Sequence, residues 1–248
     1  MALQVYAAGR VIRVLIDAFL PHRGLALAAR GLASGTEPRA YTEDAVISDM
    51  EQFAYVRLDA LRAAPRGPRD WVVVLVLAAG GKYAQHGPDL RRLLEGVESE
   101  RAAGEGRLDE ILVVAEEGFF AKKNLTDVVR DAQRRFQRGR AGPADAAGDA
   151  AGAQPFCSAA QYCHFVFALP EARAVAPHRV MRPAEVEELL GRERLTLADL
   201  PTARDTDAAV LWAGGREGQV VEILRDSQTV GRAPYWRRIE RGPLAGGA

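Results

Sequence analysis

Residues 71–77 read WVVVLVL, an unbroken apolar run that is rich in β-branched side chains. Continuous rather than alternating apolarity predicts a strand that is buried on both faces of a sheet. Residues 110–115 read EILVVA and form a second run of this kind, and residues 88–103 between them carry leucine and valine at helical spacing. Strand, helix and strand of these lengths form a βαβ unit. We therefore expect two parallel strands joined by a right-handed crossover.

Further helices are predicted before this unit. The first twenty residues carry apolar side chains at helical spacing, and we interpret them as an amphipathic helix ending before Pro21, in preference to a transit peptide. A second helix is expected over residues 42–61, with Thr42 as its candidate N-cap.

After the βαβ unit the pattern changes twice. Residues 121–138 have an apolar stripe typical of a helix. Residues 139–154 are small, polar or helix-breaking, so we expect a flexible linker or insertion there. Aromatic and β-branched residues then return, and a strand is expected over residues 164–169.

Residues 171–248 have a different character. Pro183 at a first helical position and Gly191 at a terminating position predict one helix between them. The glycine-rich stretch 214–218 predicts a hairpin turn among short strand-like pieces. These pieces are residues 208–212, 219–224, 226–231 and 235–239. The sequence thus predicts an α+β chain, with an α/β domain over residues 1–170 and a small, mainly antiparallel β domain with one helix over residues 171–248.

Composition limits the function. Basic and acidic residues balance at 33 each, so the chain as a whole has no field that attracts nucleic acid, and such a role requires a local patch. Two cysteines are fewer than a secreted disulfide framework usually has, so a reducing compartment is expected. No run reaches the ~18 apolar residues of a membrane span, and no membrane partner is expected.

No convincing catalytic or metal-binding motif occurs in the sequence. The glycines of residues 214–218 lack the Lys-Ser/Thr pair of a phosphate-binding loop. Cys157, Cys163 and His164 offer three soft ligands, whereas a structural zinc takes four, so we interpret them as a buried thiol and a strand histidine. The other histidines stand without a nucleophile motif nearby. We expect no catalytic residue, no metal site and no cofactor.

Basic residues gather between residues 118 and 140, where seven of them accompany two acidic ones, a local charge of 7 − 2 = +5. The stretch begins a helix, whose free N–H groups add to the positive field. Such a surface binds DNA phosphates without sequence preference. The candidate DNA-proximal residues are Lys122, Lys123, Arg130 and Arg134. The alternative interpretation is a solvated helix face beside a linker.

A series of motifs runs in one order along the C-terminal part. They are APHRVM at 176–181, PAEVEELL at 183–190, DLP at 199–201, GQVVEIL at 218–224, Arg225, Ser227, Thr229, Gly231-Arg232, and YWRRI at 235–239. In this order they resemble the assembly domain of the small subunit shared by the nuclear RNA polymerases, which has a shorter archaeal relative. The chain departs from that family at Asp207-Ala208, where Asp-Pro is common, and at Leu211-Trp212, near a usual arginine. These departures put one contact with the largest subunit in doubt.

The N-terminal half resembles the jaw domain of the eukaryotic-type subunit more loosely, a domain that the archaeal relative lacks. Residues 119–123, FFAKK, correspond to a loop near downstream DNA, and only its Ala-Lys portion is kept. The insertion at 139–154 is not typical of the family.

The resemblance implies a non-catalytic subunit of a multisubunit DNA-dependent RNA polymerase. A nuclease-like jaw domain would lie near downstream double-stranded DNA, and the assembly domain would dock on the largest subunit, while the active site lies in other subunits. The candidate subunit-interface residues are His178, Arg225, Arg232 and Tyr235, which alternatively only order the last hairpin.

Two other functional interpretations are considered. One is a stand-alone adaptor using the assembly domain. The other is an inactivated or cryptic nuclease in the N-terminal half, which is disfavoured because no carboxylate–lysine constellation lies on the buried strands. The implied location is the nucleus, or the virion or viral factory if a large DNA virus encodes the chain.

Overall fold

The computed structural model describes residues 2–28, 55–62, 70–77, 87–103, 107–121, 123–138, 156–227, 229 and 231–244. The chain divides into two compact units. The N-terminal unit comprises Met1–Ala141, Gly152–Phe167 and Leu244–Ala248, and the C-terminal unit comprises Gly142–Ala151 and Ala168–Pro243. The predicted linker at 139–154 lies outside the described residues. That residues 1–170 and 171–248 fold as independent domains stays a prediction.

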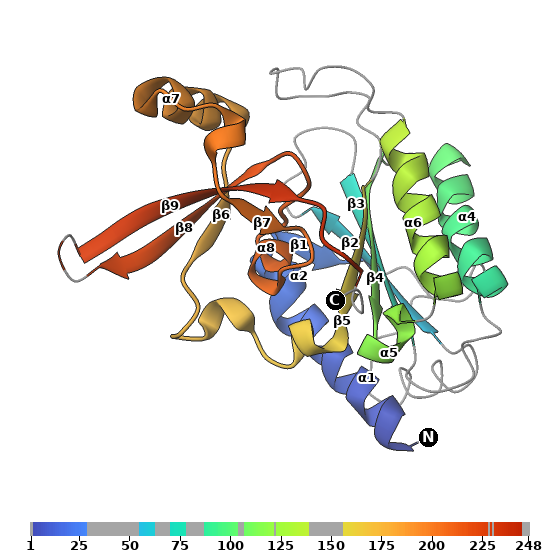
Figure 1. Ribbon diagram of the computed structural model, residues 1–248. Helices are drawn as coiled ribbons and strands as arrows, with labels where there is room; N and C mark the ends of the chain where they lie inside the picture. The colour runs from blue at the N-terminus through green and yellow to red at the C-terminus, as the bar shows by residue number, and fades with distance from the viewer. Residues whose placement is uncertain are drawn as a thin grey trace. The chain divides into compact units, whose positions relative to one another are not determined.

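The N-terminal unit is built on a five-stranded sheet of order β1-β2-β3-β4-β5 (Figure 1). The strands are β1 (Leu25–Leu27), β2 (Tyr55–Arg62), β3 (Asp70–Leu77), β4 (Arg107–Ala115) and β5 (Phe156–Gln161). β1, β2 and β3 pair antiparallel, whereas β3, β4 and β5 pair parallel. Residues 71–77 and 108–115 are buried apart from the half-buried Asp109. The two predicted strands and their parallel pairing are therefore confirmed.

Helices lie against both faces of this sheet. They are α1 (Ala2–Val14), a π-helical turn (Leu15–Phe19), α2 (Leu20–His22), α4 (Gly87–Ala103), α5 (Glu117–Phe120), α6 (Lys123–Arg138) and a 3-10 helix (Tyr162–Phe165). α4 and α6 lie side by side on one face, and α1 lies on the other (Figure 1). α4 joins the parallel strands β3 and β4, as the βαβ pattern predicts.

Three expectations for this unit are wrong. Residues 55–61, assigned to a helix over 42–61, form β2, because Val56, Leu58 and Ala60 alternate into the core and the strand pairs with β3; residues 42–54 lie outside the described residues. The first helix continues past Pro21 to His22 after the π-helical turn, whose Leu15 carbonyl accepts from the Leu20 N–H. Residues 164–169 are not a strand, since the ladder with β4 ends at Gln161.

A buried ion pair crosses the N-terminal unit. Arg23, which follows α2, places Nη2 2.7 Å from a carboxylate oxygen of Glu110 on β4. The two side chains are only 8% and 3% exposed. The Ser158 hydroxyl on β5 donates to the other Glu110 oxygen at 2.6 Å. Glu110 therefore ties the end of the first helical segment to two neighbouring strands.

The C-terminal unit contains a four-stranded sheet of order β6-β8-β9-β7. The strands are β6 (His178–Val180), β7 (Thr202–Arg204), β8 (Val220–Ser227) and β9 (Gly231–Glu240). β8 and β9 form a long antiparallel hairpin, β6 pairs antiparallel with β8, and β7 pairs parallel with β9. The sheet is thus mainly antiparallel, as expected.

Apolar clusters cover both faces of the β8–β9 hairpin. Val220 packs with Met181, with Leu189 of α7 (Pro183–Glu193) and with Leu200. Its neighbour Val221 points the opposite way because strand side chains alternate. Val221 packs in a second cluster with Ile223, Ile239 and Val210, the last on α8 (Ala208–Trp212). Two further 3-10 helices complete the unit, at Leu169–Glu171 and Leu197–Asp199.

The structure also corrects four details of the C-terminal prediction. Residues 208–212 form the helix α8 instead of a strand, because the Asp207 side chain accepts from the Ala209 N–H and caps it. The turn at 214–218 joins this helix to β8 and is not a hairpin turn. The predicted strand piece 226–231 is not one strand, because β8 ends at Ser227 and β9 begins at Gly231. α7 continues past Gly191 to Glu193, and its C-cap is Arg194, whose φ of 55° is left-handed.

The last described residues are held by Asp205. Its carboxylate accepts from the Gly242 N–H at 2.6 Å. Burial raises the pKa of Asp205 above its ordinary value, although this hydrogen bond opposes the effect. A Cβ at position 242 would lie 2.1 Å from the Thr206 hydroxyl oxygen, so only glycine fits. The chain after β9 is therefore fixed against the loop after β7.

We expect Glu110→Gln to destabilise the N-terminal unit by about 3 kcal/mol, because it leaves the Arg23 charge buried without a counter-charge. Hydrogen–deuterium exchange of the β4 amides measures this loss as a free energy of opening.

The matched control is Arg62→Gln. Arg62 is 41% exposed and pairs with Asp109 at 3.1 Å, so its loss should cost below about 1 kcal/mol. Equal effects of the two variants would contradict a special role for the buried pair.

Candidate functional site

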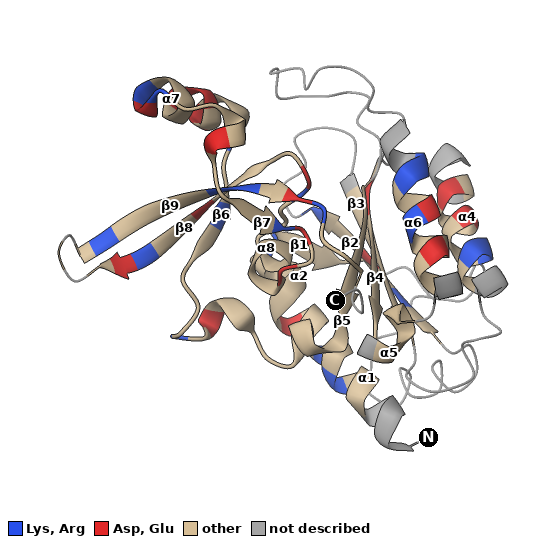
Figure 2. Cartoon of the chain, in the orientation of Figure 1, with Lys and Arg blue, Asp and Glu red and all other residues tan. Residues whose placement is uncertain are grey.

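The predicted basic stripe lies on α6, and much of its charge is paired there. Arg130 and Arg134 are exposed. Arg134 lies 3.4 Å from Asp131, which also receives Arg91 of α4 at 3.8 Å. Both acidic and basic residues occur along α4 and α6 (Figure 2). This face is therefore less positive than a count of its basic residues indicates.

Pairing between α4 and α6 continues along the helices. Arg135 of α6 lies 3.3 Å from Glu98 and 4.0 Å from Glu95, both on α4. Lys122 lies outside the described residues, as does the side chain of Lys123, which begins α6. Arg130 has no ion pair within the part of the chain that the structure describes, so it is the described candidate most open to a phosphate.

The four predicted interface residues all lie on β6 or the β8–β9 hairpin. Arg225 of β8 places its guanidinium 4.8 Å from the ring centre of Tyr235 on β9, and Tyr235 is 50% exposed. Arg232 lies opposite Asp226 in the hairpin, with a nitrogen–oxygen distance of 3.5 Å. His178 begins β6, and its Nδ1 lies 2.7 Å from the Ala176 carbonyl oxygen. The structure thus brings Arg225 and Tyr235 into contact and leaves Arg232 on a separate ion pair.

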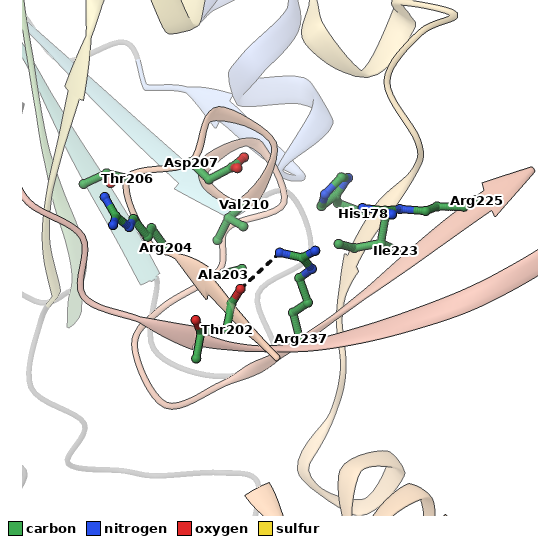
Figure 3. A pocket seen from close by; sticks show the side chains of 10 residues that line it. All are labelled: His178, Thr202, Ala203, Arg204, Thr206, Asp207, Val210, Ile223, Arg225 and Arg237. Atoms are coloured by element: carbon green, nitrogen blue, oxygen red, sulfur yellow. Dashed lines mark hydrogen bonds between the residues drawn. The ribbon is translucent and has the colours of Figure 1, made fainter. Parts of the chain in front are cut away.

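A pocket of about 410 Å³ opens on the face of the sheet that carries His178 and Arg225. Its lining comes from β6, β7, α8 and the hairpin. The residues are His178, Thr202, Ala203, Arg204, Thr206, Asp207, Val210, Ile223, Arg225 and Arg237. Figure 3 shows Arg237 reaching across the pocket toward Thr202. The Arg237 guanidinium donates to the Thr202 carbonyl oxygen at 3.1 Å.

The pocket contains residues that the sequence did not single out. Arg204 and Arg237 are basic and lie 33 positions apart in the chain, but both line the pocket because β7 pairs with β9. A signal for Arg237 was available, because it stands two residues after Tyr235 and must share that face of the strand. No sequence pattern indicated Arg204, which depends on a pairing between distant segments.

A second charged cluster fixes the start of α7. Arg179 of β6 lies 2.9 Å from both Glu185 of α7 and Glu222 of β8. Glu185 also accepts from the Arg182 backbone N–H at 2.7 Å and from its side chain at 3.0 Å. The hydrogen bonds from Arg182, and then from Arg179, lower the pKa of Glu185 to about 2. This cluster joins helix and sheet and leaves Glu185 and Glu222 already paired.

Buried carboxylates of the N-terminal sheet are paired with arginine. Asp59 on β2 lies 2.9 Å from Arg57, and Glu110 on β4 lies 2.7 Å from Arg23. The described residues contain no group of three His, Cys, Asp or Glu side chains placed to hold a metal ion. Among the helices that the structure describes, none is long and apolar enough to span a bilayer.

Comparison with known proteins matches this chain to RNA polymerase subunits. The family described as RNA polymerase Rpb5, C-terminal domain, matches residues 167–239. An African swine fever virus protein (isolate Tick/Malawi/Lil 20-1/1983), a DNA-directed RNA polymerase RPB5 homolog, is 30% identical over 173 residues, which cover 70% of this chain and 75% of that protein. RNA polymerase subunit Rpo5 of Thermococcus celer is 38% identical over 65 residues, which cover 26% of this chain and 79% of that protein.

The C-terminal match, 167–239, nearly coincides with the segment 168–243 that holds the four-stranded sheet, both apolar clusters and the pocket. The fold and the matches together define an accessory, non-catalytic polymerase subunit. The chain belongs to the Rpb5 family of DNA-directed RNA polymerase subunits.

The Glu185 carboxyl should stay ionised down to about pH 2 in the folded protein. Because its pKa is below the ordinary value of 4.5, it contributes stability that is complete above pH 4.5 and is lost as the pH falls toward 2. A carbon-13 NMR titration of the carboxyl measures this pKa.

Arg182→Gln should raise the Glu185 pKa toward 4.5, because it removes a hydrogen bond to the charged form. Arg192→Gln is the control, since Arg192 pairs with Glu193 at 2.9 Å instead. A titration midpoint near pH 4.5 for Glu185 in the wild-type protein would show that this cluster does not hold the start of α7.

Proposed function

We propose that the C-terminal unit docks the chain on the largest subunit of RNA polymerase, and that the N-terminal unit supports the jaw around downstream DNA. The near coincidence of the family match, 167–239, with this unit is the observation that carries the proposal. In this function the chain performs no bond chemistry and acts through its surfaces. The expected location is the nucleus, or the virion or viral factory if a large DNA virus encodes the chain.

The surface of the C-terminal unit has features that suit docking. Tyr235, Leu195 and Leu197 are 50%, 38% and 40% exposed, a large fraction for such side chains. Tyrosine and arginine are enriched in interfaces, and a stable interface buries at least ~1,000 Å². Tyr235 with Arg225 stacked on it offers both residue types at one place.

The proposed contact with downstream duplex rests on fewer charges than the sequence indicates. Arg134 shares its charge with Asp131. Lys122, Lys123 and Arg130 therefore remain the main candidates, and Arg134 is a secondary one. Contacts of this kind hold DNA by its phosphates and carry no sequence preference.

Affinity purification of the tagged full chain, followed by mass spectrometry, tests the docking proposal. The other subunits of one RNA polymerase should co-purify with it. Residues 171–248 alone should also join the polymerase, because they contain both apolar clusters of the C-terminal unit.

The matched control for this experiment is residues 1–170, which should not join the polymerase. A few unrelated partners in place of the polymerase would instead favour the stand-alone adaptor. Recovery of the full chain alone would contradict both functions.

Reversing the charge of both Lys122 and Lys123 to Glu should weaken retention of downstream DNA and leave assembly intact. The dependence of log affinity on log salt should become shallower by about one unit for each lost phosphate contact. Filter binding of the assembled polymerase at several salt concentrations measures this slope.

The control reverses Arg134, which is already paired with Asp131, and should change the slope less. An unchanged slope in the Lys122 and Lys123 variant would remove the proposed DNA contact.

A further inference from the structure

The pocket of the C-terminal unit has an excess of positive charge. Arg204, Arg225 and Arg237 line it, whereas Asp207 is its single acidic residue. Asp207 is also occupied, because its carboxylate accepts from the Ala209 N–H at 2.8 Å. The pocket volume of about 410 Å³ falls within the ~300–1,000 Å³ range of ligand sites.

The guanidinium groups of this pocket form no ion pair, with Asp207 or any other residue, in the described part of the chain. Arg237 donates to a neutral carbonyl oxygen, and Arg225 stacks on Tyr235. Arg204 is exposed and has no ion pair among the described residues. In Figure 3, Arg204 and Thr206 lie on one side of Arg237, and His178 and Arg225 lie on the other.

Nearby carboxylates are engaged by other arginines. Glu222 pairs with Arg179 at 2.9 Å, and Asp226 lies 3.5 Å from Arg232. Glu240 stands opposite Arg204 in the strand pairing, but its side chain accepts from Arg238 at 2.5 Å. The unpaired state of the pocket arginines is thus not caused by a shortage of acidic residues in this unit.

The charge distribution around the pocket favours a carboxylate over a nucleic acid. Residues 168–243 contain 12 arginines and 12 aspartates or glutamates, a net charge of 12 − 12 = 0. A duplex needs an extended basic surface, whereas here the excess is confined to one concave site. The planar guanidinium group forms paired hydrogen bonds with a carboxylate. The backbone carbonyl bound to Nδ1 of His178 leaves its Nε2 for a further partner.

We propose that this pocket binds the carboxylate side chains of an acidic segment from a partner polypeptide. Arg225 and Arg237 supply the charge, and Arg204 adds to it from the rim of the pocket near Thr206. The proposal rests on the proposed docking function, which requires a partner that enters this face. It adds the chemistry of that partner, namely aspartate or glutamate in an exposed segment.

Binding of a fluorescent oligoglutamate peptide to the full chain at low ionic strength tests the pocket. Arg204→Gln and Arg225→Gln should each weaken the binding about fivefold, and the double variant should weaken it further. Arg204 makes no side-chain ion pair among the described residues, so its replacement should leave the fold intact, which circular dichroism checks.

Arg173→Gln is the matched control, since Arg173 is an exposed arginine of the same unit outside the pocket. This variant should bind oligoglutamate with the affinity of the wild type. Inorganic phosphate and a short DNA duplex serve as competitors. Equal affinities of all variants, or displacement by phosphate or duplex at lower concentration than by unlabelled oligoglutamate, would overturn the proposal.

Affinity purification separates this inference from the docking function. If the wild type and the double variant recover the polymerase equally well, docking stands and the pocket proposal fails. If the wild type recovers no polymerase while oligoglutamate binding still depends on Arg204 and Arg225, the pocket stands and the docking function fails.

Discussion

Val220 and Val221 are neighbours in the chain, yet they point to opposite faces of the β8–β9 hairpin and are both buried. A two-stranded hairpin has little stability by itself in water. One face of this hairpin packs with Leu189 of α7, and the other packs with Val210 of α8. The other two strands of the C-terminal unit depend on this double burial, because among the described strands β6 and β7 pair only with the hairpin. The two apolar clusters cover both faces of the hairpin. Arg225 of β8 and Arg237 of β9 lie beside the second cluster, and the pocket forms there.

The N-terminal unit uses a different constraint. Its sheet changes from antiparallel to parallel pairing at β3, and the strands on either side of β4 are parallel to it. Burial of the Glu110 charge on β4 would cost free energy if it were unpaired. Arg23, which follows α2, offsets that cost by forming an ion pair with it. Asp59 is paired in the same way with Arg57. The charges of these two carboxylates are balanced by arginine, and the described residues hold no group of three possible metal ligands, so this arrangement gives no support to the nuclease alternative.

The sequence predicted those elements whose burial leaves a clear periodicity. β3 and β4 were recognised because both of their faces are apolar, and α7 because Pro183 marks its start. The alternation of apolar residues over 55–61 is too short to distinguish a strand from a helix, and pairing with β3 decides their state. Residues 208–212 hold apolar residues on every side, so periodicity could not separate strand from helix, although Asp207 as an N-cap was a usable signal.

The same cap explains one departure from the family. Proline is common at the first position of a helix, and Ala208 occupies that position after Asp207. Asp207-Ala208 begins a helix here, at a position that also suits proline, so this change leaves the framework intact. The pocket was beyond prediction, because Arg204 and Arg237 meet only through the pairing of β7 with β9.

The position of β9 has a consequence for synthesis on the ribosome. β9 lies between β8 and β7 in the sheet, although it is the last of the four strands to be translated. β7 therefore waits without a partner until residues 238–240 emerge, and the Asp205 hydrogen bond forms only after Gly242 follows. A nascent chain stalled before that point exposes an unpaired strand edge, which promotes aggregation. The fold of the C-terminal unit is therefore complete only once β9 and Gly242 have been translated.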